Sequence, residues 1–404
     1  MSAPVYPPLK VGIYNEPVGH GVGGSETLVA LVAESLARDH AVEIVHHVGG
    51  LTAGKIAAAS GADLSRVTAR FVERDYEPTP YRANPRERFR AARAWHAALS
   101  SPYDLFVATL HDIPPFCHAP RGALIVLFPT ATAPHLLDLP EELRRKSSLR
   151  RGAERAYRRF EWRRRLAGYQ VATSISDFTR RWTRRRWEVE SEVVFPPVDT
   201  RFEVVPKERL ILSVGRFALR GEGHTKNQPE MLAAYHELEP GLPGWGYQTA
   251  GGLRDTDAHR AFFASLAERA ALCRNARVLA ELEREELRSL FERASIFWHA
   301  AGYGEDEASR PELAEHFGIS TVEAMAAGCV PVVIRKGGQP EIVRHGVDGF
   351  LWDTLEELKG YTRTLAADDD LRARMSESAR ARSRLFGKEA CVGRYSELLR
   401  PLLS

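Results

Sequence analysis

The 404-residue sequence has little cysteine, no long apolar run and almost no net charge. Its four cysteines are widely spaced without a C-x-x-C pair, which argues against a disulfide framework and a zinc site and favours a reducing cytoplasm. The longest apolar run, 324–334, is interrupted by Gly328 and Pro331 and is too short to span a bilayer. Residues 1–8 lack the features of a secretion signal. A net charge of +3 does not by itself indicate a nucleic-acid partner, so these absences predict a cytoplasmic globular protein.

Short apolar runs alternate with longer helical patterns, which predicts α/β layers built on parallel sheets. The first unit contains a strand at 10–14, a glycine loop, a helix at 25–38 and a strand at 41–46. A linker, Pro196-Pro197-Val198-Asp199, precedes a second start of the pattern. We therefore predict two Rossmann-like domains, 1–198 and 199–385, with parallel sheets facing a cleft between them. Further strands are predicted at 105–109, 123–128, 170–174, 191–195, 210–214, 246–250, 276–279, 296–299 and 330–334, and a last helix at 386–403.

Two glutamates, Glu315 and Glu323, stand eight positions apart around a predicted helix start. Gly318 argues against one continuous helix through both. Ser320 precedes Glu323 by three residues, which is the spacing of a capping box, and Gly328 can close the helix as its C-terminal glycine. We expect Glu315 in a loop and Glu323 in the first turn of a short helix. A purely structural cap would explain the same spacing.

The segment from Glu315 to Val333 closely resembles the donor-site signature of retaining glycosyltransferases of the GT-B fold, family 4 type. The sequence of this segment is most similar to that of the branch that includes the lipid-linked mannosyltransferases. The resemblance implies that Glu315 contacts hydroxyls of the transferred sugar and that Glu323 binds the nucleotide ribose. The backbone amides of Phe317, Gly318 and Ile319 would lie near the positive end of the helix, where anions bind.

This resemblance covers nearly the whole chain and implies transfer of a mannose- or glucose-type hexose. The donor would be a GDP- or UDP-linked sugar and the acceptor a glycan or a lipid-linked glycan. It also implies that the terminal helix, within 386–404, crosses back onto the first domain. No residue set resembles a divalent-metal centre, so we expect no obligatory metal or other cofactor.

The segment Gly19-His-Gly21-Val-Gly23-Gly24 matches the G-x-G-x-x-G pattern of dinucleotide-binding dehydrogenases. Two features count against that function. The glycine turn does not follow its strand directly, and His46 and His47 stand where a ribose-binding carboxylate is expected. Gly23 and Gly24 instead resemble the family's loop that approaches the donor phosphate, although a plain tight turn stays an alternative.

Gly215 and Arg216 end a predicted strand, and Lys226 follows ten residues after the arginine. Fixed cations at this place would stabilise a departing diphosphate. The family uses an arginine and a lysine for this purpose, usually about five residues apart. The family role is therefore assigned more firmly to Arg216 than to Lys226.

His111 follows another strand end, where many relatives carry a histidine near the reacting end of the sugar. A structural histidine is the alternative, and Asp112 is the weaker candidate for a base.

The stretch 141–187 holds sixteen arginine or lysine residues against five acidic ones. With its interspersed aromatic residues, it could contact an anionic membrane or a pyrophosphate-linked acceptor. Nucleic acid is a formal alternative partner, and a solvated helix face with aromatic core contacts is the structural alternative. The favoured function is a glycosyltransferase. A GT-B phosphorylase, a sugar-nucleotide epimerase and a non-catalytic sugar-nucleotide-binding subunit stay as alternatives.

Overall fold

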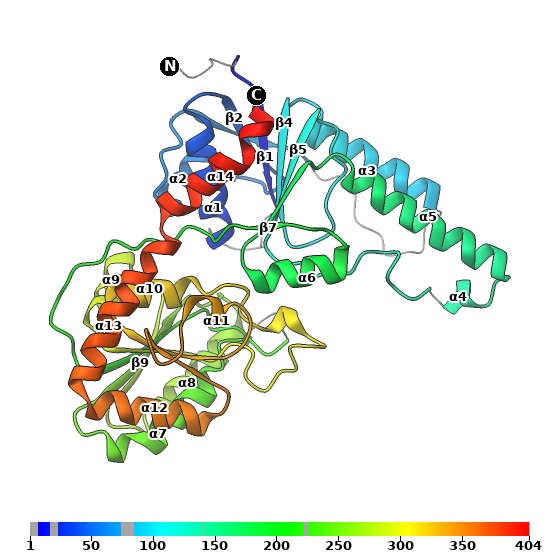
Figure 1. Cartoon of the computed structure of the whole chain (residues 1–404). Helices are drawn as coiled ribbons and strands as arrows, with labels where there is room; N and C mark the ends of the chain where they lie inside the picture. The colour runs from blue at the N-terminus through cyan, green and yellow to red at the C-terminus, as the bar shows by residue number, and fades with distance from the viewer. Residues whose placement is uncertain (1–6, 17–22, 74–84, 140, 222–224, 404) are drawn as a thin grey trace. The chain divides into compact units, whose positions relative to one another are not determined.

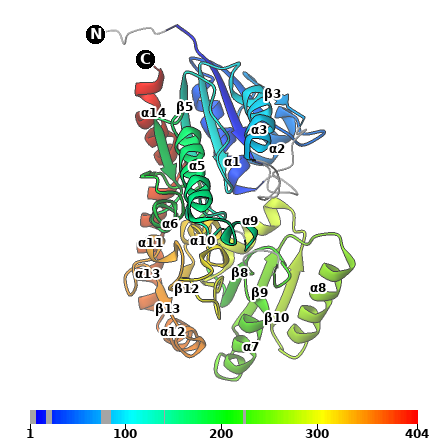
Figure 2. The same ribbon diagram turned by 90° about the vertical axis from the view of Figure 1, so that its right-hand side faces the viewer.

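The computed structural model describes residues 7–16, 23–73, 85–139, 141–221 and 225–403. The chain divides into two compact units, Met1–Pro197 with Cys391–Ser404, and Val198–Ala390. Each described unit contains a parallel sheet with helices around it (Figures 1 and 2). The predicted α/β class with two parallel sheets is confirmed. Gly19 and Gly21 of the predicted glycine pattern lie outside the described residues.

The first unit has a seven-stranded sheet in the order β3-β2-β1-β4-β5-β6-β7. Its central strand β4 is buried at every position because both faces are covered, which explains its continuous apolar sequence. The strands are β1 (Lys10–Asn15), β2 (Ala41–His46), β3 (Val67–Phe71), β4 (Leu105–Leu110), β5 (Arg121–Val126), β6 (Val171–Ser174) and β7 (Glu192–Val193). The helices are α1 (Gly24–Leu36), α2 (Ala53–Ser60), α3 (Pro85–Ser100), α4 (Glu141–Arg144), α5 (Ser148–Leu166), α6 (Asp177–Trp187) and α14 (Lys388–Leu403).

Most of the C-terminal helix α14, from Cys391 onward, belongs to the first unit. Arg121 Nη1 donates a hydrogen bond of 3.0 Å to the carbonyl of Leu402, and the hydroxyls of Thr173 and Tyr395 lie 3.3 Å apart. These contacts attach the end of the chain to β5 and β6, which lie more than two hundred residues earlier in the sequence.

The second unit has a six-stranded sheet in the order β10-β9-β8-β11-β12-β13. In Figure 2, β8, β9 and β10 lie side by side and α8 lies beside them. The strands are β8 (Leu210–Val214), β9 (Gly246–Gly251), β10 (Ala276–Ala280), β11 (Ile296–His299), β12 (Val330–Ile334) and β13 (Phe350–Trp352). The helices are α7 (Gln228–Leu238), α8 (Asp257–Ala270), α9 (Arg284–Arg293), α10 (Ile319–Ala327), α11 (Gln339–Ile342), α12 (Leu355–Ala367) and α13 (Asp369–Ser383), with 3-10 turns at Glu239–Gly241, Pro311–Leu313 and Arg384–Phe386.

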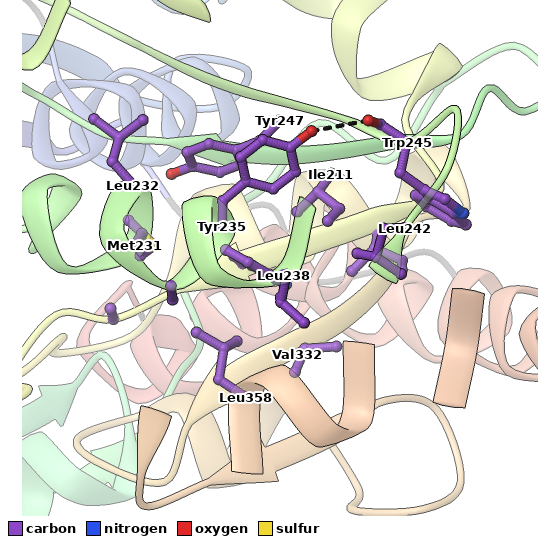
Figure 3. Packing of buried hydrophobic residues seen from close by; sticks show 14 of the residues in the cluster. Ile211, Met231, Leu232, Tyr235, Leu238, Leu242, Trp245, Tyr247, Val332 and Leu358 are labelled. Atoms are coloured by element: carbon purple, nitrogen blue, oxygen red, sulfur yellow. Dashed lines mark hydrogen bonds between the residues drawn. The ribbon is translucent and has the colours of Figure 1, made fainter. Parts of the chain in front are cut away.

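The core of the second unit packs α7 and α12 against the sheet (Figure 3). The rings of Tyr235 and Tyr247 lie 5.4 Å apart between centroids, and the Tyr235 hydroxyl donates a hydrogen bond of 2.8 Å to the carbonyl of Trp245. The buried hydroxyl of Tyr235 therefore has a hydrogen-bond partner, as buried polar groups in a core require. Leu358 of α12 and Val332 of β12 belong to the same cluster.

Candidate functional site

In both sheets the order of strands reverses at one place, between β1 and β4 in the first unit and between β8 and β11 in the second. At such a point the connections leave the sheet in opposite directions, and ligands of open α/β sheets bind beside the carboxyl ends of the strands there. Most of the predicted site residues follow one of these four strand ends directly or after a loop. The topology thus supplies two places for a site, one in each unit.

In the first unit, Gly23 and Gly24 form the start of α1, with Gly23 as the N-cap. The backbone amide of Gly23 donates a hydrogen bond of 2.8 Å to Glu26 Oε2, and the Ser25 hydroxyl donates to the same oxygen at 2.8 Å. Glu26 is buried, and the Nδ2 of Asn15 from the end of β1 lies 3.4 Å from its Oε1. A carboxylate therefore holds the predicted phosphate loop at the start of α1.

His111 follows β4, where its own amide and that of Asp112 donate to Glu16 Oε2 at 3.2 and 3.3 Å. Its carbonyl accepts bonds from the amide and hydroxyl of Thr130, both at 2.9 Å. Burial lowers the pKa of His111 to about 4, against the opposing effects of the Glu26 carboxylate and a hydrogen bond to the backbone of Phe128. The imidazole is therefore neutral at neutral pH, so it can serve as a hydrogen-bonding group but not as a fixed cation.

In the second unit, Glu315 contacts side chains from two regions that are far apart in the sequence, the loop after β8 and the end of β11. Lys226 forms an ion pair with Glu315 Oε2, and the Nε2 of His299 lies 3.0 Å from the same oxygen. His299 is the last residue of β11, whereas Lys226 lies in the loop between β8 and α7. The structure thus brings Lys226 and Glu315 of the predicted set together and adds His299, which the sequence analysis did not select.

Gly215 has a packing role beside this ion pair. A Cβ atom at residue 215 would lie 2.5 Å from Cγ of Lys226, so the lysine side chain crosses the glycine backbone closely. Arg216, the next residue, is exposed. A recess at these strand ends is lined by Ser213, Gly215, Lys226, Gln228, Thr249 and His299, among others.

The start of α10 differs from the prediction. Gly318, with φ of 124°, is the N-cap, and the helix begins at Ile319, so Ser320 is not a cap and Glu323 lies beyond the first turn. The physical reason is that glycine adopts this backbone conformation without a steric penalty and turns the chain directly into the helix. Gly328 ends α10 in the left-handed conformation, as predicted.

A Cβ atom at residue 318 would also lie 2.6 Å from Nε2 of Gln339, so a larger residue here would force the buried Gln339 side chain to move. Phe317 is buried and packs edge-on against Phe386 at 5.7 Å. The amides of Phe317, Gly318 and Ile319 therefore stand at a rigid helix start, where the helix dipole favours an anion. Their assignment to a donor phosphate stays a prediction.

Glu323 occupies the fifth position of α10 and is half-buried. Burial raises its pKa to about 7, the Asp199 carboxylate raises it further, and the Arg284 guanidinium opposes both. Asp199 lies 3.9 Å from Arg284 and 3.7 Å from Arg288. The two glutamates of the motif thus have different environments, since Glu315 has a direct cationic partner.

The arginine-rich stretch, 141–187, contains α4, α5, β6 and α6. Trp162 and Trp187 belong to the core, where their indole nitrogens donate to the carbonyls of Trp187 and Ala131 at 2.9 and 2.7 Å. Arg158 is buried and pairs with Glu154 at 2.8 Å. The remaining surface is basic: arginines 150, 155, 159, 163, 164, 180, 181, 184 and 185 are exposed.

Among the described residues, no group of three or more histidine, cysteine, aspartate or glutamate side chains could hold a metal ion. The same part of the chain contains no helix that is both long and apolar enough to cross a bilayer.

Residues 199–382 match the family described as "Glycosyl transferases group 1". This part of the chain is a glycosyltransferase group 1 domain, and it contains β8 to β13 with Arg216, Lys226, His299 and both glutamates of the motif.

Among curated proteins, the chain is similar to "GDP-Man:Man(3)GlcNAc(2)-PP-Dol alpha-1,2-mannosyltransferase" of Dictyostelium discoideum. The identity is 26% over 262 residues, which are 58% of this chain and 49% of that protein. It is also similar to the D-inositol 3-phosphate glycosyltransferase of Streptomyces griseus, with 34% identity over 97 residues, 23% of this chain and 20% of that protein. The chain therefore spans about half the length of the first relative and a fifth of the second.

Solved structures match over nearly the whole chain. The glycosyltransferase from Rickettsia africae ESF-5 has a TM-score of 0.66 at 14% identity, covering 99% of this chain and 100% of that one. HepE from Anabaena, solved in complex with UDP-glucose, has a TM-score of 0.63 at 16% identity, covering 97% of this chain and 100% of that one. At these identities the likeness shows the fold, and the predicted GT-B fold class is confirmed.

Two residues at strand ends, Glu16 and His299, and one in the first turn of α1, Glu26, were not predicted as site residues from the sequence. A signal for His299 was present, since it ends an apolar run that was itself predicted as a strand. The contact with Glu315 was not visible, because it depends on the path of the loop 300–314 between them.

Proposed function

We propose that this protein is a retaining glycosyltransferase that moves a hexose from a nucleoside-diphosphate sugar to a hydroxyl of a glycan or glycolipid. One observation carries the proposal. Glu315 is bound by Lys226 and His299 beside the carboxyl ends of β8 and β11, inside a glycosyltransferase group 1 domain. A carboxylate, a cation and a helix start at a strand-order reversal can bind sugar hydroxyls and a diphosphate together.

In the proposed complex, the Glu315 carboxylate accepts hydrogen bonds from hydroxyls of the transferred sugar. Arg216 and Lys226 bind the diphosphate, with the amides at the start of α10. Since negative charge on the diphosphate increases as the glycosidic bond breaks, these cations stabilise the transition state more than the bound donor. Glu323 holds the ribose hydroxyls of the nucleotide.

The proposed reaction proceeds on one face of the sugar. The bond between the anomeric carbon and the diphosphate oxygen breaks, and the acceptor oxygen forms a bond to the same carbon from the same side. The departing diphosphate oxygen takes the proton of the acceptor hydroxyl, so the atoms and charges balance without a protein nucleophile. His111, neutral and at the end of β4, is proposed to bind near the reacting end of the sugar.

The donor is proposed to be a GDP- or UDP-linked hexose of the mannose or glucose type. The Dictyostelium relative is named for GDP-mannose, and the Anabaena structure contains UDP-glucose. A thermal-shift screen of both nucleoside diphosphates and their hexose derivatives distinguishes them, because the ligand that binds the folded state best raises the melting temperature most at equal concentration.

The decisive experiment measures nucleoside-diphosphate release with and without a glycan or lipid-linked acceptor. We expect release to require the acceptor, apart from slow hydrolysis. Glu315→Gln and Arg216→Ala should each lower turnover by about 100-fold or more, since each removes a charged contact made in the transition state. Arg277→Ala, an exposed cation of β10, is the matched control. Near-normal turnover in both site variants would contradict the assignment.

Product analysis separates the alternative functions. A phosphorylase would consume inorganic phosphate and release a sugar phosphate, and an epimerase would convert the donor sugar without any acceptor. A non-catalytic binding subunit would bind the donor but show no turnover with any acceptor.

We also propose that the basic face of α5 and α6 contacts an anionic membrane that carries the acceptor, which would make the protein a peripheral one on the cytoplasmic side. Two apolar side chains of α5, Leu149 and Phe160, are 81% and 56% exposed among the exposed arginines. Exposed apolar groups surrounded by cations can enter the interface of a bilayer while the arginines contact lipid phosphates.

Liposome sedimentation tests this contact. The protein should bind vesicles with 30% anionic lipid and bind neutral vesicles much less, with salt weakening the binding as for any surface electrostatic contact. Replacing Arg155, Arg159 and Arg163 by glutamine should reduce retention, whereas the same change at Arg254, Arg269 and Arg277 of the second unit should not. Equal retention on neutral and anionic vesicles would reject the proposal.

A further inference from the structure

His299 and Lys226 both contact the same oxygen of Glu315, Oε2, and the two side chains differ in rigidity. His299 ends β11, which is paired with both β8 and β12, and its side chain is only 2% exposed. Its Nε2 lies 3.0 Å from Glu315 Oε2. Lys226 reaches the same oxygen with a long flexible side chain from a loop. An imidazole with two side-chain torsions on a central strand is held in place far better than an ammonium on a four-carbon stem.

The direction of the His299 hydrogen bond follows from charge. An ionised carboxylate only accepts, so Nε2 carries the proton and donates to Glu315. Burial and the nearby Lys226 lower the pKa of His299, while the bond to Glu315 opposes them. The ring is therefore neutral, with Nδ1 unprotonated. Nδ1 has no hydrogen-bond partner among the described residues.

The two partners respond differently to a bound diphosphate. Lys226 is a cation on a long side chain, and its attraction to two negative phosphates competes with its attraction to one carboxylate. His299 is neutral, so a diphosphate does not attract it in this way. Once Lys226 moves toward the phosphates, the bond from His299 still holds the carboxylate.

We propose that His299 is the positioning residue of the sugar site, holding Glu315 in place when the donor diphosphate draws Lys226 away. The inference rests on the proposed function, because it takes Glu315 as the sugar ligand and Lys226 as a phosphate ligand. When the diphosphate binds, Lys226 leaves the Glu315 carboxylate, which then becomes accessible to the sugar hydroxyls. The two steps are therefore coupled. A hydrogen bond to a charged group corresponds to about 10- to 100-fold in an equilibrium or a rate.

Two amide substitutions separate positioning from packing. In His299→Gln the side-chain nitrogen replaces Nε2 and keeps a donor toward Glu315, whereas in His299→Asn the shorter side chain does not reach. We expect His299→Asn to lower kcat by about 10- to 100-fold and His299→Gln by less than about fivefold. Binding of GDP or UDP, which carry no sugar, should change by less than about twofold in both variants. His259→Asn, at another buried histidine of this unit, is the control for loss of a buried imidazole.

A measurement without turnover completes the test. In long-range proton–nitrogen spectra of imidazoles, the signal lost in His299→Gln should show the neutral tautomer protonated at Nε2. It should keep that tautomer when GDP or UDP is added, and it should shift in Glu315→Gln.

Three results would overturn the inference: a ring protonated at Nδ1 at neutral pH, equal loss of kcat in the asparagine and glutamine variants, or weakened binding of the nucleoside diphosphates in His299→Asn. Failure of the proposed function has a different signature. The wild-type protein would then turn over no nucleotide sugar, and the spectra would still decide whether His299 donates to Glu315.

Discussion

At the scale of residues, the two motif glutamates have opposite electrostatic environments. Glu315 has a cationic partner in Lys226, whereas Glu323 is half-buried near a second carboxylate, Asp199. An ion pair favours the charged form of a carboxyl group, and burial with a like charge disfavours it. Two chemically identical side chains eight residues apart are thus suited to different tasks, and Glu323 is the one that changes charge near neutral pH.

Glu323 gives a prediction for stability against pH. Its pKa in the folded protein is about 7, above the ordinary value of 4.5, so between these values the folded state binds more protons than the unfolded state. Stability contributed by this group is present below pH 4.5 and is lost as the pH rises through 7. The melting temperature of Glu323→Gln should therefore fall less between pH 5 and pH 8 than that of the wild type.

Differential scanning calorimetry at a series of pH values measures this difference, with Glu285→Gln, an exposed glutamate of α9, as the control. Parallel curves for the wild type and Glu323→Gln would show that Glu323 titrates normally in the folded protein.

At the scale of elements, one half-buried lysine binds the ends of two helices. Lys207 Nζ donates at 2.7 Å to the carbonyl of Glu292 in α9 and at 2.7 Å to that of Ala327 in α10. Carbonyls at helix C-termini have no partner within the helix and carry partial negative charge, so a cation there satisfies both needs. The C-terminus of α10 is thereby fixed by contacts within the second unit.

Replacing Lys207 by methionine should lower the free energy of unfolding of the second unit by about 1–3 kcal/mol, because the carbonyls of Glu292 and Ala327 lose a charged donor while the packed stem is largely kept. Urea unfolding of the wild type and Lys207→Met measures the loss. Arg277→Met, at an exposed cation of the same unit, should change stability by less than about 0.5 kcal/mol. Equal effects of the two changes would mean that the contacts of Lys207 do not stabilise the helix ends.

At the scale of the whole molecule, each unit has its own buried aromatic core. The core of the first contains Trp95, Trp162 and Trp187, and that of the second contains Tyr247 and Trp298. Units with separate cores can unfold separately, so a single two-state transition is not expected for this chain.

Calorimetry should resolve two transitions, and GDP or UDP, whichever binds, should raise the one that belongs to residues 198–390. The physical reason is mass action, since a ligand stabilises the folded state that binds it. Arg216→Ala should reduce this shift without changing the ligand-free transitions, because Arg216 is exposed. A shift confined to the other transition would contradict the predicted place of the nucleotide.

The sequence predicted the central strands well. Strands β8, β11 and β12 begin and end where their apolar runs do, because a parallel strand covered on both faces needs apolar side chains at nearly every position. Strand β3 was missed because it carries Thr68 and Arg70, and β13 because three residues make too short a pattern. The start of α10 was placed on Ser320, since a capping-box spacing is visible in a sequence and a glycine with positive φ is not.

The sequence by itself therefore determined the α/β class, most of the strands and the segment that contains Glu315, Gly318 and Glu323, because periodicity and local motifs depend on neighbouring residues. The tertiary structure alone decided which side chains meet. Lys226 and Glu315 are 89 positions apart and His299 is 16 from Glu315. They converge because β11 lies beside β8, while β9 and β10 occupy the other side of β8. Strand order is set by the packing of the whole unit, which no local pattern encodes.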